Sequence, residues 1–167
     1  MVEWIGGIIR RELVSLRKEV EAYPSDADLW KAVPGISNSG GTLALHLAGN
    51  LRHFIGGVLG GSGYRRNRDG EFATRDLSRA DLVREVDDAI AAVERTFAGL
   101  SDVILATDYP EKVANVRVKT GDFLVHLESH LAYHLGQIDY HRRIATGSAV
   151  TVGTVSPARL GSAVPAE

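Results

Sequence analysis

The sequence of 167 residues contains no cysteine. Disulfides, iron–sulfur clusters, thiolate zinc sites and cysteine nucleophiles are therefore excluded. No apolar run approaches the roughly 18 residues that a membrane span requires. The short apolar run near the N-terminus follows Glu3 and precedes Arg10 and Arg11, which reverses the charge order of a secretory signal. These absences predict a soluble cytoplasmic protein that does not contact membranes, in which histidine and carboxylate carry any metal chemistry.

An excess of positive charge is also missing, because the formal net charge is −2. Proteins that bind nucleic acid usually have a basic domain or stripe, so we expect no nucleic-acid partner. The sequence has no GxSxG elbow, P-loop or dinucleotide fingerprint. The segment HLAYH has Leu131 and Ala132 where the zinc-protease motif HExxH places its general base, so a protease of that class is not expected.

The apolar residues recur at helical spacing in four segments, and the chain length is that of one domain. Amphipathic helices of this kind bury their apolar faces against one another. We therefore predict an all-α fold, a four-helix bundle with two long connections, over residues 1–147. Residues 148–167 are predicted to form an extended or docked tail. The expected helices cover residues 2–22, 42–59, 79–99 and 120–143.

The segments between these helices carry weaker signals. Residues 24–41 are rich in turn formers, with at most one short helical turn near residues 28–32. Residues 60–76 form a glycine-rich and charge-rich loop of a length that usually indicates function or mobility. Residues 101–119 contain two β-branched runs that suggest short extended pieces, and Thr120 is the predicted N-cap of the last helix. Gly6 and Gly7 either weaken the first helix or allow a neighbouring helix to approach closely.

His130 and His134 lie on the apolar face of the last predicted helix, beside Leu127 and Leu131. The i, i+4 spacing places their Cβ atoms about 5–6 Å apart, which suits two ligands of one metal ion. Two adjacent buried imidazoles are costly unless their nitrogens find partners. The alternative is a pair of core histidines that form hydrogen bonds with their neighbours. The spacing favours half of a metal site.

The third ligand is predicted to be His46, on a stripe of the second helix that also carries Asn50 and His53. His53 lies two turns further on, about 10 Å along the helix axis, so one ion cannot easily bind both histidines. Three histidines leave coordination positions for water or substrate, as catalytic sites do. An ion held in this way lowers the pKa of a bound water or thiol.

Other polar residues near these histidines are candidates for lining a pocket or supporting the ligands. His126 extends the histidine row by one turn, as a ligand or a proton shuttle. His141 is expected to line a pocket or to lie at the surface. Gln137 is expected either to orient a ligand or to be an ordinary amide at a helix contact. The predicted pocket or supporting residues are Asn50, His53, His126 and Gln137.

Three arginines cluster in the loop that follows the second helix: Arg65, Arg66 and Arg68. One interpretation is that they hold an anionic group of a substrate. The other is a solvated loop, because charged side chains on loops usually face water.

The segments LALHLAGNLRHF and HLAYHLGQ resemble those of the DinB-like (DinB/YfiT) metal-binding four-helix bundles, whose pattern is a histidine, three residues, a second histidine and then Gly-Gln. GNLRHFIGGVLGG and YRRNRDGEF are similar to an uncharacterised bacterial subgroup. The resemblance covers about residues 2–147. It implies that His46, His130 and His134 are the three metal ligands.

The resemblance further implies a divalent metal cofactor (nickel, zinc, iron or manganese), homodimers and, in some relatives, a transferase or isomerase that uses mycothiol or bacillithiol. One hypothesis is thus a metal-dependent thiol S-transferase or hydrolase, in which the ion activates a small-molecule thiol, or water, for attack on a small electrophilic substrate. The other is a metal-stabilised binding or stress-response module without turnover.

Overall fold

The computed structural model describes residues 1–153 and 156–166. Within these residues every regular element is a helix, with three isolated β-bridges in the connections, so the predicted all-helical class is confirmed. No helix in this part of the chain combines the length and the apolar character that crossing a membrane requires. The α-helices are α1 (Val2–Glu21), α2 (Asp26–Trp30), α3 (Gly40–Leu51), α4 (Arg68–Ala73), α5 (Arg79–Ala98) and α6 (Thr120–Thr146). The other helices are the π-helix η1 (Arg52–Leu59) and the 3₁₀-helices η2 (Asp102–Ala106) and η3 (Pro157–Arg159).

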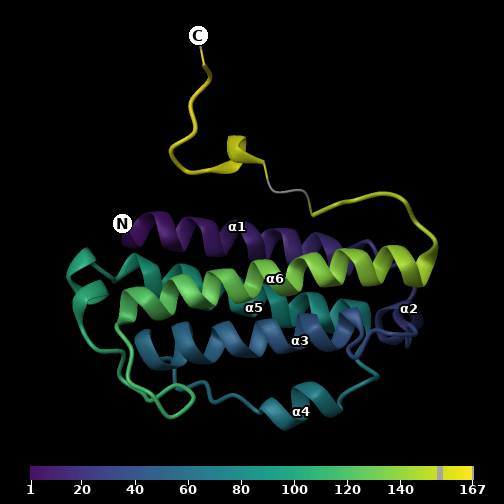
Figure 1. Cartoon of the computed structure of the whole chain (residues 1–167), viewed down its shortest axis with the longest axis horizontal. Coiled ribbons are helices and arrows are strands. Elements are labelled where there is room, and N and C mark those ends of the chain that lie inside the picture. Colours follow the sequence, from purple (N-terminus) through teal and green to yellow (C-terminus); the bar gives the residue numbers. More distant parts are fainter. Residues whose placement is uncertain (154–155, 167) are drawn as a thin grey trace.

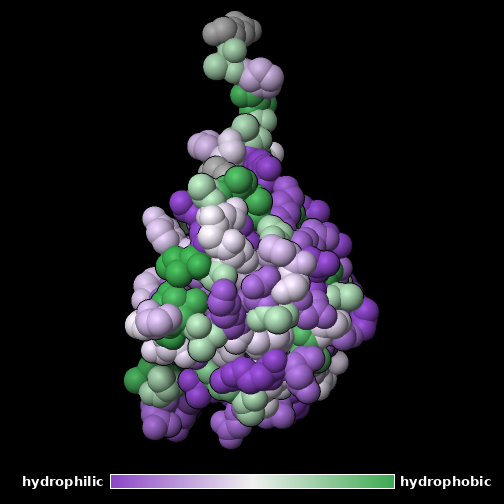
Figure 2. Space-filling model, turned by 90° about the vertical axis from the view of Figure 1, so that its right-hand side faces the viewer, coloured by the Kyte–Doolittle hydropathy of each residue, from purple (hydrophilic) through white to green (hydrophobic). Residues whose placement is uncertain are grey.

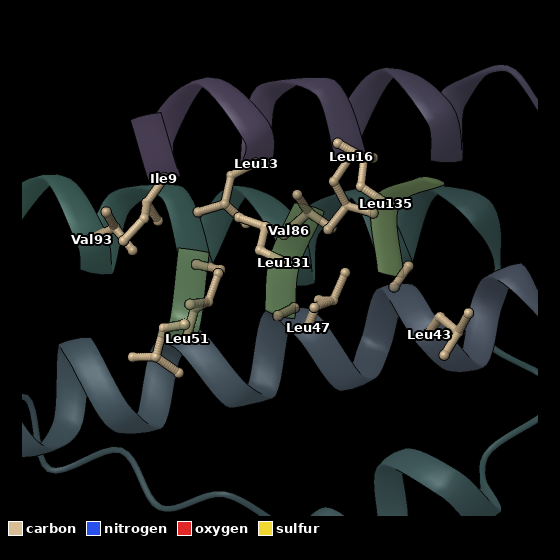
Figure 3. Packing of buried hydrophobic residues seen from close by; sticks show 14 of the residues in the cluster. Ile9, Leu13, Leu16, Leu43, Leu47, Leu51, Val86, Val93, Leu131 and Leu135 are labelled. Carbon is tan, nitrogen blue, oxygen red and sulfur yellow. The ribbon is translucent and has the colours of Figure 1, made fainter. Parts of the chain in front are cut away.

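The long helices lie side by side (Figure 1), with α1 and α3 each packed against both α5 and α6. Each contributes an apolar stripe at helical spacing, and these stripes meet in one core. Hydrophilic residues cover much of the end face that Figure 2 turns to the viewer, and part of the tail rises above the body of the molecule. Figure 3 shows the core contacts of Ile9, Leu13 and Leu16 from α1, Leu43, Leu47 and Leu51 from α3, Val86 and Val93 from α5, and Leu131 and Leu135 from α6.

Two long helices begin at serine caps, whereas the predicted cap of the last helix does not act as one. Ser39 and Ser78 accept hydrogen bonds from the backbone N–H groups of Thr42 and Asp81. Thr120 is not the N-cap of α6, so that prediction is wrong. Thr120 is instead the first residue of the helix and is buried. Its backbone N–H donates a hydrogen bond to the Thr107 carbonyl at 2.9 Å. At the other end, α6 stops where Gly147 adopts a φ of 72°.

The second predicted helix changes type along its length. It begins as α3 and continues as the π-helix η1 from Arg52, six residues after His46. The backbone of η1 also accepts a hydrogen bond from outside the helix, because the Tyr109 hydroxyl donates to the Phe54 carbonyl at 2.7 Å. Gly56 brings η1 close to α5, because a Cβ there would lie 2.9 Å from Ala92 Cβ. Apolar periodicity does not distinguish an α-helix from a π-helix, and π segments often occur near functional sites.

Two connections contain helical turns that sequence patterns did not indicate. The loop after η1 includes α4, where Asn67 accepts a hydrogen bond from Gly70 N. Residues 102–106 form η2, so the predicted extended piece is wrong there. Val113 and Val116 bond to each other across a tight reversal at Ala114 and Asn115, both of which have positive φ, and this reversal interrupts the second β-branched run.

The first part of the tail docks on the helices through a buried ion pair. Glu19 of α1 and Arg142 of α6 meet at 2.7 Å, and both are almost completely buried. Arg142 donates to the Val150 carbonyl at 2.8 Å, and Gly153 N–H donates to Glu19 at 2.7 Å. For residues 154–155 and 167, the tail prediction lies outside the described residues. The boundary between residues 147 and 148 stays a prediction.

Candidate metal centre

The three predicted ligands come together between α3 and α6. Each of His46, His130 and His134 offers a ligand atom within 4.8 Å of the others. His46 is buried and the other two are half-buried. The Nε2 atoms of His46 and His130 lie 3.3 Å apart. Two nitrogens bound tetrahedrally to zinc at normal bond lengths are about 3.3–3.4 Å apart, so this spacing fits a shared divalent ion.

The protonation of these histidines also suits metal binding. Burial, followed by the influence of His134 and His46, lowers the pKa of His130 to about 4. Burial likewise lowers the pKa of His134, although its hydrogen bond with Gln137 opposes the shift. Both imidazoles are therefore neutral near pH 7, with a nitrogen lone pair available. Within the described residues, His130 Nδ1 and Asn50 Oδ1 are buried without a hydrogen-bond partner, which marks this region as more than ordinary core.

Gln137 contacts one of the three predicted ligands. Its Oε1 atom is 2.6 Å from His134 Nδ1. Because an amide oxygen only accepts hydrogen bonds, Nδ1 must carry the proton, and the lone pair of His134 is then on Nε2. This contact supports the orienting interpretation of Gln137 over that of an ordinary helix-contact amide.

Glu71 also lies at the site, although no pattern in the sequence indicates it. It lies on α4, is 5% exposed, and places Oε2 3.3 Å from His46 Nδ1. Burial raises its pKa, but hydrogen bonds with His46 and Arg66 outweigh this, and the net pKa is lowered. Glu71 is therefore a buried carboxylate beside a predicted ligand. Gly49, three residues after His46, leaves room for this carboxylate, since a Cβ there would overlap with Glu71 Oε1.

The remaining candidate residues lie outside the three-histidine group. His126 is exposed and stacks between Phe123 and His130, with ring centroids 5.9 and 6.3 Å away. His53, on η1, lies 3.6 Å from Glu111. Asn50 is buried one turn after His46. The roles of these three residues as pocket or supporting residues stay predictions.

His141 does not lie at the surface, so that interpretation is wrong. It is completely buried, with Nδ1 2.8 Å from the Tyr23 hydroxyl and Nε2 2.9 Å from the Lys31 carbonyl. Tyr23 and Lys31 belong to the segment between α1 and α3, which folds over this part of α6. His141 therefore ties that segment to the helix.

The three loop arginines have three different partners. Arg65 is largely exposed and lies 3.8 Å from Glu111. Arg66 binds both carboxylate oxygens of Glu71, and Arg68 lies over the Phe72 ring at 4.9 Å. The anion-binding role of this loop stays a prediction.

An open pocket of about 430 Å³ adjoins the histidine group. His134 and Gln137 form one wall, and Tyr133 and Tyr140 lie beside them on α6. Residues 35–38 and Leu43 form the other side. Among the described residues, no lysine, arginine, aspartate or glutamate lines the pocket, so it suits an uncharged part of a ligand.

Comparison with known proteins adds one match. The family profile described as mycothiol-S-transferase matches residues 5–147, the part of the chain that contains all three histidines, α4 and the pocket. A search of curated proteins found no match.

Proposed function

The chain belongs to the mycothiol-S-transferase family, and from this premise we propose that it is a metal-dependent thiol S-transferase built on a four-helix bundle. The family is DinB/YfiT-like and metal-binding, so the resemblance noted from the sequence is confirmed. The reaction, the metal requirement and the bundle are our proposals. The observation that carries them is the convergence of three histidine ligand atoms within 4.8 Å beside an open, uncharged pocket.

His46, His130 and His134 would hold a divalent ion, with nickel, zinc, iron and manganese as the candidates. When bound, the ion supplies the Lewis acidity that lowers the pKa of a small-molecule thiol. Gln137 keeps His134 in the tautomer that binds through Nε2.

The pocket beside His134 would place the small electrophilic substrate next to the thiol. A bond forms between the thiol sulfur and the electrophilic atom, the leaving group departs with the bonding electron pair, and the thiol proton passes to a base. We propose His126 for that base because it is exposed and stacked on His130.

Elemental analysis of purified protein tests the metal site. We expect a divalent ion in the wild-type protein and in His126→Ala, and little or none in His46→Ala and His134→Ala. His126 is a matched control because it lies on the same helix and outside the three-histidine group. Equal metal content in all four proteins would contradict the site. The wild-type analysis also identifies the metal.

The same preparations decide between catalysis and the alternative of a metal-stabilised binding or stress-response module. We expect mycothiol to be consumed with small electrophiles only when the ion is present. If thiol is not consumed and no ester or amide is hydrolysed, while metal removal lowers the melting temperature, the module is the correct interpretation. The homodimer that the resemblance implies stays a prediction, which sedimentation would test.

A further inference from the structure

The Nδ1 atom of His46 has two hydrogen-bond partners that require opposite protonation. Arg66 Nη2 lies 2.6 Å from it, and Glu71 Oε2 lies 3.3 Å from it. A guanidinium only donates hydrogen bonds, whereas an ionised carboxylate only accepts them. In a neutral imidazole Nδ1 is either a donor or an acceptor, so His46 satisfies one partner at a time.

Each partner therefore selects a different tautomer of His46. When Arg66 donates to Nδ1, the ring proton is on Nε2, the atom that faces His130. When Nδ1–H donates to Glu71, the lone pair is on Nε2 and is available to a metal ion. The change between tautomers breaks the N–H bond at Nε2 and forms one at Nδ1, and the ring stays neutral. Only the tautomer selected by Glu71 is competent for ligation through Nε2.

The geometry of Arg66 allows it to release His46 without leaving Glu71. Its Nε atom lies 2.8 Å from Glu71 Oε1, and its Nη2 atom lies 2.6 Å from Oε2. Nη2 carries two hydrogens, so one can keep its hydrogen bond to Glu71 while the other breaks its hydrogen bond to His46 Nδ1. The side chains of Arg66 and Glu71 are only 11% and 6% exposed, so water competes weakly for these contacts.

The surroundings hold the Glu71 carboxylate in place. Gly49 leaves the space that its Oε1 atom occupies, because a Cβ at that position would lie 2.1 Å from this oxygen. The Asn67 side chain accepts a hydrogen bond from the Gly70 N–H at the start of α4, the short helix that carries Glu71. The space beside Gly49 on α3 and the capped helix α4 thus both hold Glu71 in contact with His46.

We propose that Glu71 and Arg66 act as opposing positioning residues for the ligand His46. Glu71 stabilises the tautomer that binds metal through Nε2, and Arg66 stabilises the other. The inference rests on the metal site proposed above. It makes the loop between η1 and α5 a determinant of metal affinity although that loop supplies no ligand.

Metal affinity measured by competition with a chelator tests the proposal, because the two substitutions act in opposite directions. We expect Glu71→Gln to weaken zinc binding roughly 10- to 100-fold, the usual effect of losing a partner of a ligating histidine. We expect Arg66→Met to strengthen it roughly tenfold, since one competing charge-assisted hydrogen bond is removed. Arg52→Met and Glu85→Gln alter a separate ion pair and should change nothing. Weakening by both Glu71→Gln and Arg66→Met would overturn the proposal and indicate a merely structural ion pair.

Long-range ¹H–¹⁵N spectra of the histidine side chains, recorded on metal-stripped protein at pH 8, test the tautomer directly. Relative to wild type, we expect more Nδ1–H form of His46 in Arg66→Met and less in Glu71→Gln. Gly49→Ala should resemble Glu71→Gln because it displaces the carboxylate without removing it, whereas Gly7→Ala, at an open helical position, should not. An unchanged tautomer in all variants would sink this inference. Absence of metal from wild type would instead sink the proposed function, since the spectra do not depend on bound metal.

Discussion

At the scale of residues, the hydrogen-bond partners of each histidine separate structural histidines from those of the site. Both ring nitrogens of His141 have partners in the fold, one at Tyr23 and one at Lys31. His130 has a buried Nδ1 atom without a partner and an Nε2 atom that faces another histidine. A histidine whose two ring nitrogens both form hydrogen bonds within the fold has no free lone pair with which to bind a metal ion. His141 is therefore structural, although it shares a helix with two ligand candidates.

The buried state of His141 predicts how stability depends on pH. Burial lowers its pKa, although the hydrogen bond to the Lys31 carbonyl opposes the shift. Below about pH 6.5 the unfolded chain binds a proton at this residue that the folded protein does not, so the free energy of unfolding falls as pH decreases. The loss continues until pH reaches the lowered pKa of the folded state. Urea unfolding of metal-stripped protein between pH 7.5 and 5 measures it.

His141→Gln isolates this contribution from other titrating groups. We expect the variant to be less stable at pH 7.5, because Tyr23 and Lys31 lose a well-placed partner. Its free energy of unfolding should depend less on pH than that of wild type over the same interval. Equal pH dependence in the two proteins would show that His141 stays neutral in both states or titrates alike in both.

The three ligand candidates were predictable from the sequence, whereas Glu71 was not. His130 and His134 share one helix at i, i+4 spacing, and His46 lies on a second helix, so helical geometry brings them together. Glu71 belongs to a loop whose path depends on its own ion pair with Arg66 and on the space beside Gly49. Such contacts have no periodic signal in the sequence.

At the scale of elements, long helices were predictable because apolar periodicity over many residues outweighs local exceptions. The residue ranges of α1, α5 and α6 differ from the predictions by only a few residues. The six-residue helix α4 is too short to show a period, and it owes its place to a cap at Asn67 and to the buried Glu71. Short elements held by tertiary contacts are therefore where sequence patterns fail.

Gly6 and Gly7 are adjacent in α1 but meet different surroundings, which gives a matched pair of substitutions. A Cβ at Gly6 would lie 2.5 Å from the Phe97 ring, whereas no atom of residues 1–153 and 156–166 lies within 4 Å of one at Gly7. Of the two interpretations of this pair, close approach of a neighbouring helix therefore applies to Gly6. We expect Gly6→Ala to lower the free energy of unfolding by about 1–3 kcal/mol through overpacking.

Gly7→Ala should instead raise the free energy of unfolding by about 0.5–1 kcal/mol, since alanine has the higher helix propensity and meets no obstacle. Urea unfolding of both variants beside wild type measures the two effects. Stabilisation by both substitutions would mean that Phe97 moves aside at no cost and that the close packing of α1 on α5 does not require glycine.

At the scale of the whole molecule, the tail supplies hydrogen-bond partners to a buried ion pair between two helices. Glu19 and Arg142 are 0% and 2% exposed, and a buried ion pair is stable only when its remaining donors and acceptors also have partners. The tail backbone supplies two of these, the Val150 carbonyl and the Gly153 N–H. We therefore predict that the folded unit extends at least to Gly153, six residues past the boundary expected from the sequence.

Two truncations test this extension, because they separate the docked segment from the rest of the tail. A chain that ends at Gly147 loses both backbone bonds, and each bond to a charged group is worth about 1.5–3 kcal/mol. We expect its free energy of unfolding to fall by roughly 3–6 kcal/mol, with a lower melting temperature by calorimetry. A chain that ends at Gly153 keeps both bonds and should match the full chain. If the shorter chain is as stable as the longer one, water satisfies the ion pair equally well, and the helical unit ends at Gly147.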